Sequence, residues 1–206
     1  MKKIAIDINN TLRDNLTQIV NCYKKLIDNK ADIKREDIDS FEFMNCLSFE
    51  SREAYNRFIY EDCAFEIFGK AEPMDKVLPY RFNDWVQNTL RDFEDTSLIP
   101  EVMLFSPLEI GMTIQATYYF LAKISCRVRE VYFPVNSATI WDRSDIVVTA
   151  NPNLLENIPE GKIGIKIVTP YNKDIECKYV FESMLELIQD KEETMIKLIK
   201  DETIDI

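Results

Sequence analysis

The chain has 206 residues and a formal net charge of −11, and it contains no histidine and only 4 glycines. The lack of histidine excludes His-based catalytic triads, HExxH zinc sites and imidazole acid–base chemistry. No two glycines have the spacing of a P-loop or a GxGxxG motif, so a glycine-rich phosphate loop is excluded too. Any chemistry must therefore use carboxylates, hydroxyls, thiols, Lys or Arg, or a metal held by oxygen atoms.

The acidic balance, 36 Asp and Glu against 25 Lys and Arg, argues against binding to a nucleic-acid backbone. The five cysteines are scattered without CxxC spacing, which indicates reduced thiols rather than a disulfide framework or a zinc site. No apolar run reaches membrane-spanning length, and the first one meets Asp7 too early for a signal peptide. We expect a cytoplasmic protein with neither a nucleic-acid nor a membrane partner.

Residues 2–9 predict the first strand, because a β-branched run is followed there by polar residues. Between about residues 11 and 95 the pattern becomes helical, with many aromatic residues and few strand-like runs. Helical periodicity is clearest in three stretches, residues 16–27, 51–58 and 82–93. We therefore predict a mostly helical insertion after the first strand.

After Pro100 the chain alternates between strands and helices. Strands are predicted at residues 101–105, 130–135, 145–150 and 162–168. Helices are predicted at residues 109–123 and, as one long amphipathic helix, at residues 179–200. This alternation predicts a Rossmann-like α/β fold, in which helices flank a parallel sheet. Functional side chains in such sheets gather at the carboxyl ends of the strands.

Four segments at these strand ends resemble the motifs of one enzyme family. Residues 7–12, DINNTL, are similar to a first motif DxDxT, and VMLFS, which ends at Ser106, is similar to the second. DIVVTANP at residues 145–152 is similar to DxLIDDNP, and PYN at residues 170–172 follows the next strand. In this order the chain resembles the haloacid dehalogenase-like phosphohydrolases, and within them the 5′(3′)-deoxyribonucleotidase group. The resemblance implies an α/β core at residues 1–13 and 98–206 and a helical cap at residues 14–97.

The resemblance also implies roles for single residues. Asp7 stands where the family's nucleophile forms an aspartyl-phosphate, and Asn9 stands at the position of the general acid. A Mg²⁺ site would use Asp7, the backbone carbonyl of Asn9 and the position of Thr149. Phosphate or ligand binding would fall to Asn10, Thr11, Ser106, Ser137, Asn151, Tyr171 and Asn172. Asparagine tolerates the left-handed conformation, so Asn10 can form the turn that often contains glycine.

Most of the charged groups of the family are missing. The Asn9 amide has no proton to give, and loss of a general acid lowers a rate by about 10²–10⁴-fold. Residues 136–139, where a lysine is expected, contain none, and the nearest downstream cation is Arg143. Thr149 and Ala150 replace the carboxylates that complete a magnesium site. We therefore expect a pseudophosphatase without bound Mg²⁺, which binds a small phosphorylated ligand such as a nucleotide, or a protein partner.

Two alternatives stay open. The first is a divergent but active phosphohydrolase or 5′-nucleotidase with Asp7 as nucleophile and cap charges as acid and cation: Glu50, Arg52, Arg57, Glu61 and Asp62. The second is an acidic protein-interaction module that acts through cap aromatic residues: Tyr55, Phe58, Tyr60, Phe65, Phe68, Tyr80 and Trp85. Simpler interpretations also fit, with an Asx turn at residues 9–10, a strand-end turn at Ser106 and aromatic packing of cap on core.

Overall fold

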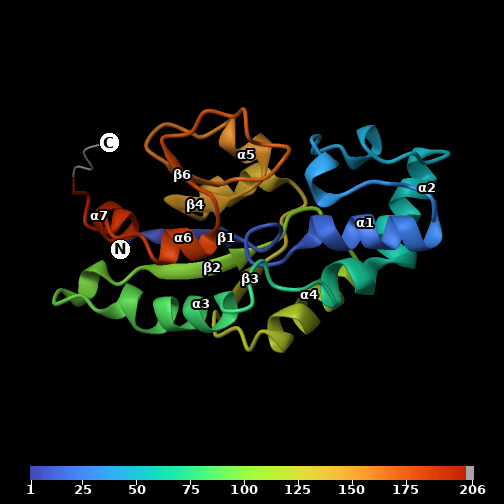
Figure 1. Ribbon diagram of the computed structural model, residues 1–206. Coiled ribbons are helices and arrows are strands. Elements are labelled where there is room, and N and C mark those ends of the chain that lie inside the picture. Colours follow the sequence, from blue (N-terminus) through green and yellow to red (C-terminus); the bar gives the residue numbers. More distant parts are fainter. Residues whose placement is uncertain (203–206) are drawn as a thin grey trace.

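The computed structural model describes residues 1–202, which contain one parallel sheet of six strands in the order β3-β2-β1-β4-β5-β6 (Figure 1). The strands are β1 Lys3–Asp7, β2 Glu101–Phe105, β3 Glu130–Tyr132, β4 Ile146–Thr149, β5 Ile163–Ile167 and β6 Tyr179–Phe181. The predicted α/β class is therefore confirmed. The central strand β1 pairs with β2 and β4, which brings the ends of all three to one edge of the sheet.

Helices cover both faces of the sheet, as expected for strands that are apolar on both sides. They are α1 Asn15–Leu26, α2 Arg52–Arg57, α3 Leu78–Gln87, α4 Met112–Lys123, α5 Pro152–Leu155, α6 Met184–Ile188 and α7 Thr194–Ile199. Ile4 and Ile6 of β1 pack in a core cluster with α3, α4, α6 and α7, whereas Ala5 packs on the other face with α5. This alternation is the two-residue period of a strand.

The helices between β1 and β2 form a cap-like insertion with a hydrophobic cluster of its own. In Figure 1, α1 and α2 lie beyond the edge of the sheet where β1 ends. Leu16, Ile19 and Tyr23 on one face of α1 pack there with Phe58 and Ile67, which follow α2. The Asp14 side chain caps α1 by accepting a hydrogen bond from the Thr17 amide at 3.1 Å.

The predicted division into core and cap stays a prediction, and residues 203–206 lie outside the described part of the chain. Helix α3, which the predicted limits 14–97 place in the cap, packs on the sheet through Leu78, Phe82 and Trp85. We therefore propose that the cap ends near residue 77. Of the seven aromatic residues named above for the cap, Phe58, Phe68 and Trp85 are buried, three are half-buried, and Tyr80 is exposed. Within residues 1–202, no helix has the length and apolar character needed to cross a membrane.

The predicted long helix at residues 179–200 is wrong. The first residues form the edge strand β6, and two short helices, α6 and α7, follow. Ser183 caps α6 by accepting a hydrogen bond from the Glu186 amide at 3.1 Å. Glu193 has a φ of 54°, and the Asp190 side chain accepts from the Thr194 amide at 2.9 Å. These local capping bonds interrupt a segment whose apolar spacing alone indicates a continuous helix.

The predicted helix at residues 109–123 begins three residues late, at Met112. Leu108 and Gly111 have positive φ angles, 64° and 53°, so the chain turns twice before the helix. The turn places Glu109 in the interior, where it is 5 % exposed, rather than in a first helical turn. Strand β3 is shorter than predicted, and it ends before Pro134, which has no N–H for a ladder.

Candidate functional site

Asp7 is the last residue of β1, and its side chain is 2 % exposed. One carboxylate oxygen, Oδ1, accepts a hydrogen bond from the Asn9 amide at 3.0 Å. The other, Oδ2, accepts from the hydroxyl of Thr149, the last residue of β4, at 2.7 Å. Because β1 and β4 are paired, two strand ends that lie far apart in the sequence meet here. Asp7 and Thr149 are therefore together, as the sequence motifs predict.

The Asp7 carboxyl is held in a poorly solvated place. Burial raises its pKa to about 7, while the hydrogen bonds from Thr149 and Asn9 and the charge of Arg13 act in the opposite direction. At neutral pH the group is therefore divided between its protonated and ionised forms. A hydroxyl at position 149 stabilises the carboxylate with one hydrogen bond, whereas a second carboxylate there would repel it.

The turn after β1 depends on Asn10. Its φ of 55° lies in the left-handed region, which confirms that asparagine can form this turn. Both polar atoms of its side-chain amide form hydrogen bonds: Nδ2 donates to the Tyr171 hydroxyl at 3.0 Å, and Oδ1 accepts from the Leu16 amide at 3.2 Å. Asn10 thus joins the sheet edge, the start of α1 and the loop that follows β5.

A fully buried arginine, Arg13, lies beneath this turn. Its guanidinium makes five hydrogen bonds, and its Nη2 forms an ion pair with Glu109 at 2.6 Å, with side-chain exposures of 0 % and 1 %. The acceptors are Asn15 Oδ1 at 2.9 Å, the Phe68 carbonyl at 2.7 Å, Thr117 Oγ1 at 2.6 Å, Asn9 Oδ1 at 2.5 Å and Glu109 Oε1. An arginine side chain has five N–H donors, so none is left for a ligand.

Ser106 and Glu109 complete this network. The Ser106 hydroxyl donates to Glu109 Oε1 and accepts from Asn9 Nδ2 at 2.7 Å. Thr117 Oγ1 donates to Glu109 Oε2 at 2.5 Å. The Asn9 amide is therefore fixed on both sides, by Ser106 and by Arg13. Ser106 lies next to Asn9, as its strand-end position predicts, but its hydroxyl is engaged within the protein.

The other predicted site residues divide into two groups. Asn151 and Tyr171 line a cavity next to Asp7. Thr11 is fully buried under the turn, where its hydroxyl donates to the Asn9 carbonyl at 3.4 Å. Asn172 is buried as well and bonds only to backbone, to the Thr169 amide and the Ala150 and Ile167 carbonyls. Ser137 begins a 3₁₀ turn, Ser137–Asp142, and does not line the cavity.

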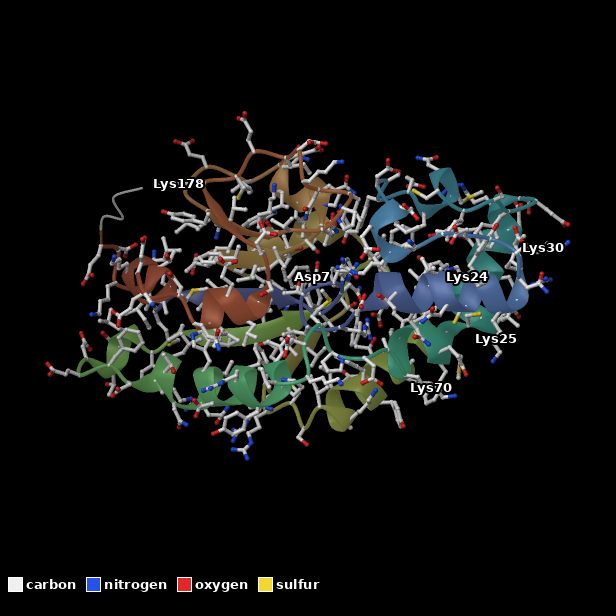
Figure 2. All side chains as sticks on the ribbon, in the orientation of Figure 1. Asp7, Lys24, Lys25, Lys30, Lys70 and Lys178 are labelled. Atoms are coloured by element: carbon white, nitrogen blue, oxygen red, sulfur yellow. The ribbon has the colours of Figure 1, made fainter. Side chains whose placement is uncertain are left out.

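No lysine side chain lines this cavity within residues 1–202. Figure 2 shows Asp7 near the middle of the molecule and other labelled residues, Lys30, Lys70 and Lys178, toward its outer edge. Arg143, the nearest cation downstream in the sequence, lies over the Tyr132 ring and pairs with Glu130 at 3.8 Å. It therefore does not replace the missing lysine.

The donors around Asp7 do not fit Mg²⁺, the ion that the resemblance implies. Within residues 1–202, no group of three His, Cys, Asp or Glu side chains could hold a metal ion. Thr149 Oγ1 already donates to Asp7 and accepts from the Asn151 amide at 2.9 Å. Ala150 has no ligand atom. Magnesium needs several hard oxygen ligands in near-octahedral geometry, which one carboxylate does not supply.

The cavity lies between the cap and the sheet edge and has a volume of about 220 Å³. Asp7 is on its wall, together with Glu109, and an exposed pair, Glu42 and Arg52, lines it as well. Much of the remaining lining is aromatic: Phe41, Phe43, Tyr55, Tyr60, Phe68 and Tyr171. Five asparagines line it too: Asn9, Asn10, Asn15, Asn56 and Asn151. Apolar walls combined with polar groups are typical of small-molecule sites.

Comparison with known proteins finds solved structures with a similar fold, but it does not assign the chain to a family. No family model matches the chain, and no curated protein matches it. A solved dehalogenase with an intermediate complex has a TM-score of 0.53 at 12 % identity, over 91 % of this chain and 95 % of that one. A haloacid dehalogenase-like hydrolase from Burkholderia xenovorans LB400 has a TM-score of 0.49 at 11 % identity, over 95 % and 99 %. The chain thus has a haloacid dehalogenase-like fold with a cap-like insertion.

The sequence motifs missed two residues, Arg13 and Glu109. Arg13 follows the DINNTL segment directly, and Glu109 comes three residues after Ser106. Charges of opposite sign just after two adjacent strand ends are a signal for such a pair, because parallel neighbours place those ends side by side. Because the sequence predicts a helix that begins at residue 109, Glu109 was assigned to the first helical turn and not to the end of a strand.

Proposed function

We propose that this protein binds a small molecule in the pocket beside Asp7 and does not transfer phosphoryl groups. The observation that carries the proposal is the state of Arg13, the cation acting on Asp7, whose five N–H groups are all used within the protein. Phosphoryl transfer depends on cations that neutralise the phosphate as it passes through the transition state. With no donor free on Arg13, the cation that remains at the pocket is Arg52, which is exposed and already paired with Glu42 at 3.4 Å.

The residue at the acid position supports the same conclusion. The Asn9 amide donates to Ser106 and accepts from Arg13, so it is a fixed part of the framework. An amide cannot protonate a leaving oxygen and then activate water, as a carboxyl group does. The nucleotidase reaction is therefore a weaker proposal than binding without phosphoryl transfer. We further propose a cytoplasmic location, in line with five free cysteines.

A phosphatase assay tests this proposal. The purified chain is incubated with p-nitrophenyl phosphate and with nucleoside monophosphates, with and without Mg²⁺, and Asp7→Asn serves as the matched control. We expect phosphate release by the natural chain to equal that by the control. Mg²⁺-dependent release that the substitution abolishes would show an active phosphohydrolase instead.

A second candidate function is displacement at carbon, which one observation favours: Asp7 meets a pocket with largely apolar walls. In this reaction the carboxylate would attack a carbon that bears a halide, forming an ester bond and releasing the halide. Water would then cleave the ester, giving an alcohol and returning a proton to solvent. A halide needs no acid and no metal to leave, and one solved structure with a similar fold is a dehalogenase. Halide release from short, uncharged haloalkanes, lost in Asp7→Asn, would support this candidate, and no release would exclude it.

A further inference from the structure

The balance of charge in the pocket indicates what kind of ligand it takes. Four charged side chains line the cavity. Glu109 is neutralised by its ion pair with Arg13 at 2.6 Å, and Glu42 is paired with Arg52 at 3.4 Å. Asp7 has hydrogen bonds but no ion pair within the described residues. Its carboxylate is therefore the uncompensated charge of the pocket, and each of its oxygens keeps a lone pair free to accept another hydrogen bond.

The aromatic side chains that line the cavity indicate what kind of group the rest of the ligand carries. Phe41, Phe43 and Tyr171 form one aromatic group, with ring centroids 5.4 Å apart for Phe41–Tyr171 and 6.4 Å apart for Phe43–Tyr171. Tyr55 and Tyr60 add further rings from α2 and the turn after it. Aromatic faces attract both planar rings and cations. The cavity of about 220 Å³ is smaller than the roughly 300–1,000 Å³ of pockets for drug-sized ligands, which suits one ring.

From this arrangement we infer that the pocket binds a small arylalkylamine, with the protonated amine against Asp7 and the ring among the aromatic side chains. The inference rests on the proposed function, since it names the ligand class of the same pocket. An anion such as a phosphate monoester would meet the Asp7 carboxylate with no free cation beside it. An ammonium group instead supplies the positive charge that the pocket lacks, and it donates hydrogen bonds to the oxygens of Asp7.

Calorimetry with the full chain at pH 8 tests the charge requirement with three single-ring probes. Benzylamine carries a positive charge, benzyl alcohol is its neutral counterpart, and phenyl phosphate is anionic. We expect benzylamine to bind about 10- to 100-fold more tightly than benzyl alcohol, the ratio typical of a charge-assisted hydrogen bond. Asp7→Asn should remove that ratio. Glu101→Gln, which changes an exposed carboxylate at the start of β2, should keep it.

The outcomes separate this inference from the proposed function. Equal binding of benzylamine and benzyl alcohol, or no binding of either, overturns the inference. Tighter binding of phenyl phosphate without its hydrolysis also overturns it, while the proposal of binding without phosphoryl transfer stands. Hydrolysis of phenyl phosphate overturns the proposed function itself. Because the three probes are compared on the natural chain, the test does not depend on the folding of any variant.

Discussion

Two arginine–glutamate pairs lie at the pocket, and they differ in their exposure to solvent. Arg13 and Glu109 are 2.6 Å apart, with exposures of 0 % and 1 %, and every donor of the arginine has an acceptor. Arg52 and Glu42 are 3.4 Å apart, with exposures of 66 % and 62 %. We refer to them as the buried pair and the rim pair. The same two residue types therefore stand in two different environments.

The difference follows from solvation. Removal of one partner of a buried pair leaves a charge without water or counter-ion, which costs several kcal/mol, whereas an exposed pair contributes little because water replaces it. The buried pair thus fixes the turn after β1 and the start of the chain segment before α4. The rim pair can separate at little cost, because water solvates both charges. Asp7 lies between these extremes, buried like the first pair but without a partner cation.

The largest expected effect comes from breaking the buried pair. Arg13→Met should lower the free energy of unfolding by about 3–5 kcal/mol, because Glu109 would remain buried and unpaired. Urea unfolding followed by circular dichroism measures this change. Arg52→Met is the matched control at the rim and should change the stability by less than about 0.5 kcal/mol. Equal effects of the two substitutions would contradict the distinction between the pairs.

The next effect concerns Asp7 and its raised pKa. A carboxyl with a pKa of about 7 in the folded state and about 3.9 when unfolded binds its proton more tightly in the folded protein. The folded state therefore loses stability as pH rises from about 4 to 7, by about 4 kcal/mol for this group. Asp7→Asn removes this loss, so the variant should gain stability over the natural chain between pH 4 and pH 8. Unfolding curves of both proteins across this pH range measure the difference. If the free energies of unfolding of the two proteins changed equally with pH, Asp7 would be solvated in the folded state.

A smaller effect is expected at Tyr171, whose hydroxyl accepts from Asn10 Nδ2 at 3.0 Å. Tyr171→Phe leaves the amide of a 3 % exposed residue without this acceptor, which should cost about 1–2 kcal/mol. Tyr80→Phe removes a hydroxyl from an exposed ring and should cost almost nothing. The stability difference between these two variants, from thermal unfolding, tests whether the Asn10 bond supports the turn. A cost at Tyr171 no larger than at Tyr80 would exclude that role.

The sequence predicts the sheet well because its central strands are buried on both faces. Ile4, Ile6, Val147 and Val148 are all fully buried, and such continuous β-branched runs have few other interpretations. The edge strand β6 was not predicted, since its burial alternates and its residues also match a helical period. Its pairing with β5 is a tertiary contact, which spacing along one segment does not contain.

The sequence motifs indicate which positions lie at the sheet edge, but they do not indicate which side chains pair there. Asp7, Asn9, Ser106 and Thr149 meet because parallel strands end at a common edge, which the motifs already imply. The ion pair of Arg13 with Glu109 depends on two left-handed residues before α4, and no motif describes them. Only the folded chain determines which charge balances which.

The smallest expected effect is at the rim pair. Glu42→Gln leaves Arg52 unpaired but still in water, so the free energy of unfolding should change by less than about 0.5 kcal/mol, and added salt should not alter the result. Because the freed arginine then repels a cation near the pocket, benzylamine should bind slightly more weakly to this variant, by less than about threefold. Urea unfolding and calorimetry on the same preparation measure both quantities. A stability loss above about 1.5 kcal/mol would place the rim pair with the buried one, because only a desolvated charge is so costly to leave unpaired.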